Sequence, residues 1–230
     1  MIHKQEHYGV VEASFLICKG AALPIDLSTY QTVSRSYRGF LTYSYGFVAD
    51  CDLESECLHF LGPLRIDIWA VWRILALRRY GVRFSYLPSS QQTSITQGQP
   101  LPSVSEPLSE DQGWHTIEDD MITIWACQTS HASYNLNSSP QSKLDDGIFH
   151  IMLVRGSASR LDLIQIFTSI EAGDHINLNQ VEFIKCTAFR VEPVGNGITS
   201  FNDVDGEAVE DGIIQAQVNP KEMKFFIKRT

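Results

Sequence analysis

The sequence predicts a mainly β, α+β fold: an antiparallel β-sandwich or rolled sheet with two or three packed amphipathic helices. Short apolar runs fill its second half, separated by turn signals such as Asp205-Gly206 and Asp211-Gly212, and this spacing is typical of hairpins. Helical periodicity is clear at only a few segments. With 230 residues and 43% hydrophobic content, the chain can bury one substantial core. We therefore expect a single domain over residues 1–230, without internal repeats.

The first half is expected to begin with an apolar segment that fits either a strand or the end of a helix, Val10–Lys19. Residues 38–48 alternate like a half-buried aromatic strand. A short helix then runs to Leu61, because Gly62-Pro63 cannot continue it. A longer helix over 66–79, ended by Gly81, follows from an apolar stripe at i, i+3, i+4 and i+7, formed by Ile68, Val71, Trp72 and Leu75.

Residues 89–113 contain no aromatic side chain and are rich in Ser, Gln and Pro, so we expect a disordered insertion within the domain. After it, Ser159 and Asp162 form a capping-box pattern that opens a helix over Arg160–Glu171. The remaining apolar runs predict further strands: Val82–Pro88, Met121–Cys127, Ile148–Arg155, Val181–Arg190, Ile198–Val204, Gly212–Val218 and Met223–Ile227.

Charge and cysteine content exclude several classes of protein. A net charge of −9 and a pI near 5.2 argue against a nucleic-acid partner, which needs a basic face. The five cysteines include no CxxC pair, which indicates neither a disulfide framework nor a zinc site and favours a cytoplasmic location. No apolar stretch approaches the ~20 residues of a membrane span, and none resembles a secretion signal.

Four carboxylates crowd into seven positions at the expected strand-to-helix junction: Asp50, Asp52, Glu54 and Glu56. Such a cluster needs a cation, which Arg65, Arg73, or an amine-bearing or metal-bound ligand could supply. From the residues alone, a solvated helix start with Asp52 as N-cap is favoured. No phosphate-binding loop, nucleophile elbow or HExxH motif occurs. No metal site is predicted, and His175 is expected to lie in a loop or line a pocket.

The same segment resembles the sphingosine kinases, within the diacylglycerol-kinase-like lipid kinases. The matching block is GFVADCDLESE, residues 46–56, with Leu61-Gly62 and Arg65 after it. Further blocks fall in the same order at residues 73–88, 144–155, 188–193 and 204–207. The resemblance extends from about Ala13 onward, except for the segment between Pro88 and Trp114, and corresponds to the C-terminal, lipid-substrate domain of those enzymes.

The resemblance implies ATP- and Mg²⁺-dependent phosphorylation of the primary hydroxyl of a sphingoid base, giving sphingosine 1-phosphate. The reaction would take place at the cytosolic face of a membrane, with the enzyme associated peripherally. In the family, a GGDG-type loop of an N-terminal domain binds ATP and presents the general base, and this sequence contains no such loop. We therefore assign no catalytic residue to the chain. The alternatives are a non-catalytic lipid-binding or regulatory domain and a ceramide or diacylglycerol kinase relative.

The resemblance also implies residue roles, each beside a plainer structural one. Asp52 would bind the polar head of the sphingoid base, and Arg65 would face the ATP phosphates or pair with Glu54 or Glu56. His59 stands where vertebrate members carry a second phosphate-facing arginine. Asp205, Gly206 and Glu207 would contact the nucleotide, although Asp-Gly alone indicates a hairpin turn. The lipid pocket would be lined by residues that could equally be core: Phe47, Ile66, Ile74, Leu163, Ile166, Phe167 and His175. The membrane would be contacted by Ile68, Val71 and Trp72, although the pattern alone favours Trp69 and Trp72 as core.

Overall fold

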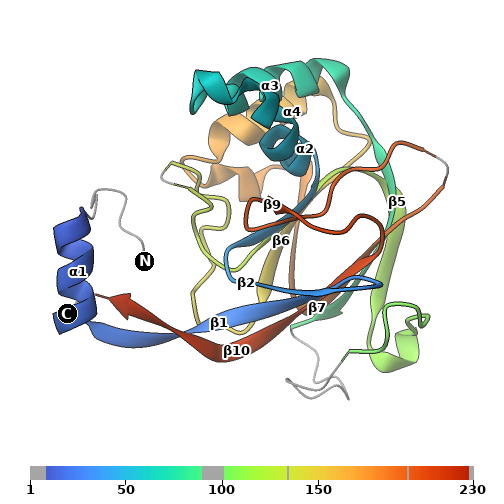
Figure 1. The fold of residues 1–230 in the computed structure, drawn as a ribbon. Coiled ribbons are helices and arrows are strands. Elements are labelled where there is room, and N and C mark those ends of the chain that lie inside the picture. Colours follow the sequence, from blue (N-terminus) through green and yellow to red (C-terminus); the bar gives the residue numbers. More distant parts are fainter. Residues whose placement is uncertain (1–8, 90–100, 134, 196, 228–230) are drawn as a thin grey trace.

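The computed structural model describes residues 9–89, 101–133, 135–195 and 197–227 (Figure 1). Within these described ranges, ten strands form one sheet in which every pairing is antiparallel. The strands are β1 Ala21–Gln31, β2 Ser36–Gly39, β3 Thr42–Gly46, β4 Tyr80–Pro88, β5 His115–Cys127, β6 Phe149–Arg155, β7 Val181–Pro193, β8 Asp203–Val204, β9 Glu207–Ala208 and β10 Ile214–Ile227. The helices are α1 Val10–Lys19, α2 Phe47–Glu54, α3 Leu64–Ala76 and α4 Arg160–Ser169, with 3-10 turns at Ser55–Leu61, Glu110–Gln112 and Asp174–Asn177.

Two long strands roll the sheet on itself. The first half of β5 pairs with β4 and its second half with β6 and β3. In the same way, β7 pairs with β6 through its first residues and with β4 and β10 through its last ones. Because β4 and β6 thus both connect β5 to β7, the sheet closes into a ring there. The predicted mainly β, rolled antiparallel fold is confirmed.

Two apolar cores lie on the two faces of this sheet. One fills the roll, with Tyr43, Phe84, Phe149 and Phe189 fully buried. The other packs between β5 and β6 on one side and helices α2, α3 and α4 on the other, which lie together on one side of the molecule in Figure 1. The helices therefore cover one face of the sheet, and α2 follows directly from β3.

Gly46 makes the turn from β3 into α2. Its φ is 85°, and a Cβ atom there would lie 2.3 Å from the carbonyl oxygen of Ile122, so only glycine fits. The helix consequently begins at Phe47. The strand expected over 38–48 is corrected to β2 and β3 with a break between them.

Other element boundaries also differ from the expectation. Val10–Lys19 is a helix, and β1, which follows it, was not predicted. Helix α3 ends at Ala76 rather than at Gly81, because Leu77 takes a left-handed conformation at its C-cap. Residues 198–202 form no strand, and only Asp203 and Val204 of that run pair with β3.

The insertion expected over residues 89–113 is only partly described, because residues 90–100 lie outside the described part. Residues 101–113 pack on the domain, which corrects the prediction of disorder there. Leu101 and Leu108 pack against the cluster that contains the buried Trp114, and Val104 is itself buried. The buried guanidinium of Arg190 also donates to the backbone carbonyl oxygens of Ser103 and Glu106. Residues 101–113 have little apolar surface of their own, but they are held by an apolar cluster that includes Trp114 and by the buried Arg190, both outside the segment.

Helix α1 lies apart from the other helices, beside the end of β10 (Figure 1). It carries exposed apolar side chains, including Val10 and Phe15. Among the described residues, no helix is long and apolar enough to cross a membrane.

Candidate functional site

The acidic segment lies on α2, and cations from α3 meet it. Asp50 is buried and accepts hydrogen bonds from Arg73, Tyr80 and Ser200. Burial raises the pKa of Asp50, whereas these donors lower it. Arg73, 1% exposed, is the counterion. This confirms Arg73 as one of the two arginines expected to balance the cluster, and it fixes α2 against α3 and β4.

Glu54 extends the network toward the surface. Its carboxylate accepts from the indole nitrogen of Trp69 at 3.0 Å and from Arg78 at 2.8 Å. Burial alone would raise the pKa of Glu54, but these two donors outweigh it and the pKa is lowered. Arg65, expected as an alternative partner of Glu54 or Glu56, instead lies beside Asp52.

Asp52 lies in the last turn of α2. The expectation that it caps the start of the helix is wrong, because Gly46 lets the helix begin at Phe47. Its side chain is 34% exposed and 3.6 Å from the Arg65 guanidinium. Among the described residues, no donor hydrogen-bonds its carboxylate. Burial raises the pKa of Asp52, with Arg65 opposing and Glu56 and Glu207 adding to the rise.

The Asp205-Gly206 turn closes the β8–β9 hairpin against this carboxylate. Both residues have positive φ, 54° and 87°, which matches the predicted type I′ turn. A Cβ atom on Gly206 would lie 3.6 Å from Oδ2 of Asp52. The Asp205 carboxylate itself accepts three backbone N–H bonds, from Phe40, Leu41 and Thr42. Asp205 therefore fixes the loop between β2 and β3, and the turn forms one wall beside Asp52.

Asp203, at the start of the same hairpin, was not predicted. It is buried, accepts from the Ser44 hydroxyl at 2.6 Å and from the Gly206 N–H at 3.0 Å, and its pKa is raised to about 6, mainly by burial. The sequence carried one signal, an acidic residue inside an apolar run expected to be a strand. Asp52, Asp203 and Gly206 thus meet at one place.

Most of the expected pocket lining gathers in the apolar cluster between the sheet and helices α2–α4. Its members are Phe47, Ile74, Leu163, Ile166 and Phe167. The Phe47 and Phe167 rings stack with centroids 4.5 Å apart. Phe167 and Ile74 are only partly buried, so the edge of the cluster reaches the surface.

Two expected lining residues lie elsewhere. Ile66 is 41% exposed and outside the cluster. His175 is buried, its Nε2 is 3.0 Å from the carbonyl oxygen of Ser138, and its ring centroid is 6.4 Å from that of Phe183 at the cluster edge. Burial lowers the pKa of His175, which favours the neutral imidazole.

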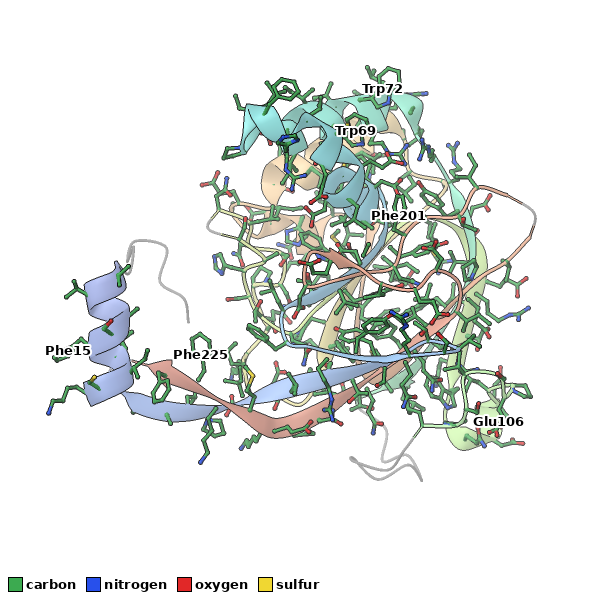
Figure 2. All side chains as sticks on the ribbon, viewed as in Figure 1. Phe15, Trp69, Trp72, Glu106, Phe201 and Phe225 are labelled. Atoms are coloured by element: carbon green, nitrogen blue, oxygen red, sulfur yellow. The ribbon has the colours of Figure 1, made fainter. Side chains whose placement is uncertain are left out.

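The apolar stripe of α3 faces outward. Ile68, Val71 and Trp72 are 49%, 60% and 58% exposed, so the pattern-based preference for Trp72 in the core is wrong. Trp69, in contrast, is partly buried and donates to Glu54. Figure 2 shows Trp72 at the outer edge of α3 and Trp69 nearer the body of the domain. Phe60 and Leu64, just before and at the start of α3, add 72% and 62% exposed side chains.

Of the residues expected to face ATP, Arg65 lies beside Asp52. Arg65 donates to the Asp52 backbone carbonyl at 3.2 Å and to the Ser55 hydroxyl at 2.9 Å. Glu207 and His59 are exposed. No group of three or more His, Cys, Asp or Glu side chains in the described part of the chain could hold a metal ion.

Comparisons with known proteins agree with this architecture. The family model described as the YegS C-terminal NAD kinase beta sandwich-like domain matches residues 111–227. Sphingosine kinase 1 of Rattus norvegicus is 30% identical and that of Mus musculus 31% identical, each over 92% of this chain. The chain spans only 58% of the length of these relatives. The crystal structure of a putative diacylglycerol kinase from Bacillus anthracis has a similar fold, with a TM-score of 0.60 at 16% identity, over 94% of this chain and 61% of that one.

Proposed function

The chain belongs to the family described as the YegS C-terminal NAD kinase beta sandwich-like domain, and we propose that it is the lipid-binding part of a sphingosine kinase. In this proposal, the whole enzyme transfers the γ-phosphate of ATP to the primary hydroxyl of a sphingoid base. The 230-residue chain supplies the lipid site and one side of the ATP cleft. The sphingosine kinases at about 30% identity support the substrate class.

One observation carries the proposal: Asp52 has a half-buried carboxylate with no hydrogen-bond donor among the described residues. Its charge is only partly balanced, because the Arg65 guanidinium stays 3.6 Å away. A substrate ammonium could donate directly to the free oxygens, and a charge-assisted bond of this kind is stronger than a neutral one. The same carboxylate could accept from a hydroxyl of the substrate and so orient the other hydroxyl for transfer.

An aliphatic tail needs an apolar lining, and the cluster under α2 supplies one. Phe47 lies five residues before Asp52 on α2, and its ring stacks on Phe167 of α4. A tail that enters at the partly exposed edge, near Phe167 and Ile74, would displace contacts between side chains rather than polar groups. Burial of each methylene contributes about 0.8 kcal/mol, so a long chain can repay the parting of these rings.

We propose that Arg65 faces the phosphates of ATP. Gly206 and Glu207 would lie beside it, and His59 would lie at the edge of the nucleotide site. A guanidinium there would stabilise negative charge on a phosphoryl group. The residues present do not fit a Mg²⁺ site, because the Asp205 oxygens already accept three backbone bonds.

We also propose that α3 rests on the cytosolic surface of a membrane. The exposed side chains of Ile68, Val71 and Trp72 form a continuous apolar stripe on one helix, which is the arrangement of an interfacial helix. Its neighbours Phe60 and Leu64 widen the patch. A lipid substrate could then pass from the bilayer to the cluster beside α3.

A second candidate function is non-catalytic binding of sphingoid bases. The absence of a GGDG loop from the 230 residues favours it for this chain on its own. A phosphotransfer assay with radiolabelled ATP separates the two, since the kinase proposal places the general base outside this chain. We expect no turnover by the isolated chain and turnover by the longer protein that contains it. Turnover by the 230-residue chain would contradict that placement.

Binding of sphingosine tests the proposal directly. We expect the chain to bind sphingosine and to bind its N-acetylated, uncharged analogue about tenfold to a hundredfold more weakly, because the charge-assisted contact with Asp52 is lost. Asp52→Asn should weaken binding of the amine by a similar factor and leave the analogue unaffected. Isothermal titration calorimetry measures all four combinations.

The matched control is Asp67→Asn, which removes the same charge from an exposed site on α3. It should not change either affinity. Equal binding of amine and N-acetyl lipid by the unmodified chain would overturn the headgroup assignment.

A further inference from the structure

Asp203 joins three parts of the candidate site through its two oxygens. Oδ2 accepts from Ser44 on β3, and Oδ1 accepts from the backbone N–H of Gly206 in the turn. Gly206 in turn faces Oδ2 of Asp52 on α2. The position of the turn relative to Asp52 is therefore set by a carboxylate that was not part of the predicted site.

The Asp203 carboxylate has no counterion in the described part of the chain. Among the described residues, no Lys, Arg or His comes within ion-pair distance of Asp203. The residue is nevertheless buried, with only 4% of its surface exposed. Buried carboxylates are normally paired with a cation or kept protonated. The titratable groups near it on packed elements are acids and phenols. The negative charges of Asp52 and Asp205 raise the pKa of Asp203, and Asp203 in turn raises the pKa of the Tyr30 and Tyr43 hydroxyls. The Arg65 guanidinium pairs with Asp52 instead.

We propose that Asp203 is a positioning residue for the headgroup site: it ties the Asp205-Gly206 turn to β3 and adds negative charge beside Asp52, which favours a cationic lipid head. This inference rests on the proposed function, because it deepens the role given to Asp52. The hydrogen bonds and the charge are separable, since an asparagine loses the charge but can still accept from the Gly206 N–H through its oxygen and donate to the Ser44 hydroxyl through its amide.

The charge has a consequence for the pH dependence of binding. Asp52 and Asp203 repel each other when both are ionised, so an ammonium held at Asp52 favours the ionised form of both. Amine affinity should therefore rise with pH as these carboxylates ionise. The Asp203 carboxylate titrates in the accessible range, with its pKa raised to about 6. The two groups titrate as a coupled pair, so removal of one charge shifts the midpoint of the other.

The experiment measures sphingosine affinity of the 230-residue chain between pH 5 and pH 8. Asp203→Asn should weaken binding about tenfold at pH 7.5, a loss equivalent to about one pKa unit of interaction. It should also move the midpoint of the pH profile to lower pH, because Asp52 loses a negative neighbour. Asp203→Ala, which also unties the turn, should weaken binding further, and the asparagine should recover that additional part.

Ser44→Ala supplies an independent test, because it should shift the midpoint of the pH profile in the opposite direction. The Ser44 hydrogen bond lowers the pKa of Asp203, so its removal should move the midpoint to higher pH while both charges remain. If Asp203 served only the folding of the chain, neither Asp203→Asn nor Ser44→Ala would move the midpoint of the pH profile of binding.

The outcomes distinguish the two proposals. If the unmodified chain prefers the amine over its N-acetyl analogue but Asp203→Asn matches it in affinity and pH profile, this inference is overturned and the proposed function stands. If the unmodified chain shows no preference for the amine, both are overturned. Circular dichroism of each variant confirms that the fold is intact.

Discussion

At the scale of single residues, Asp203 has an effect on folding that is separate from binding. Its pKa is about 6 in the folded chain and near 3.8 when unfolded, so its ionisation opposes folding. The stabilising contribution of the protonated form is fully present below pH 3.8 and is lost as pH rises through 6. Because the pKa rises from 3.8 to about 6 in a residue that is 4% exposed, the loss is about 3 kcal/mol.

We therefore predict that Asp203→Asn gains stability relative to the unmodified chain as pH rises. The difference between their free energies of unfolding should change by about 2.5 kcal/mol between pH 4 and pH 7.5, in favour of the variant. Urea unfolding at a series of pH values measures it. Asp67→Asn, at an exposed site, should show a constant difference over the same range. A constant difference for Asp203→Asn as well would contradict the buried, uncompensated state of this carboxylate.

At the scale of elements, the contact between α2 and α3 includes one fully buried ion pair. Arg73 and Asp50 are each 1% exposed, and Tyr80 joins them from β4. Arg73→Leu should lower the free energy of unfolding by about 3 kcal/mol, because the buried Asp50 loses its hydrogen-bonded counterion and keeps only Arg78, whose guanidinium lies 3.9 Å from the Asp50 carboxylate. Arg38→Leu, at the exposed pair with Glu222, should change it far less.

Chemical denaturation of both variants gives these values. The double variant Arg73→Leu with Asp50→Asn should recover part of the loss, since no full charge is then buried. Equal stability of Arg73→Leu and Arg38→Leu would show that the network does not hold α2 in place.

The outward face of α3 gives a second prediction at this scale. Replacement of Val71 and Trp72 by serine should reduce partitioning onto phosphatidylcholine vesicles about tenfold or more, because two exposed apolar side chains no longer enter the interface. Stability should hardly change, since both side chains are exposed. Val33→Ser, at an exposed site between β1 and β2, is the matched control. Sedimentation with vesicles measures the bound fraction, and an unchanged fraction for the α3 variant would remove this face from the proposal.

At the scale of the whole molecule, sequence patterns predicted the class of fold but not where its elements meet. Alternation and hairpin turns are local, so the β-rich fold and the Asp205-Gly206 turn could be recognised. The Gly46 turn, which moves Asp52 from the start of a helix to its last turn, depends on the close approach of Ile122 on β5. Asp203 escaped notice for the same reason, because its partners Ser44 and Gly206 become neighbours only when β8 pairs with β3. Residues 101–113 looked disordered because their anchor, Arg190, lies more than seventy positions away in the sequence.

The rolled sheet and its helices together predict how affinity depends on lipid length. The headgroup would meet Asp52, and the tail would enter the cluster that begins at Phe47 and Phe167, where the rings now contact each other. Beyond the cost of parting these rings, each further methylene should strengthen binding by up to about 0.8 kcal/mol, or about fourfold. Calorimetry with sphingoid bases of increasing chain length, below their micellar concentrations, measures this slope. Leu163→Ala, inside the cluster, should change the slope, whereas Asp52→Asn should lower every affinity by the same factor and leave the slope unchanged. Affinities independent of chain length would mean that the cluster stays closed and that the chain recognises only the amine.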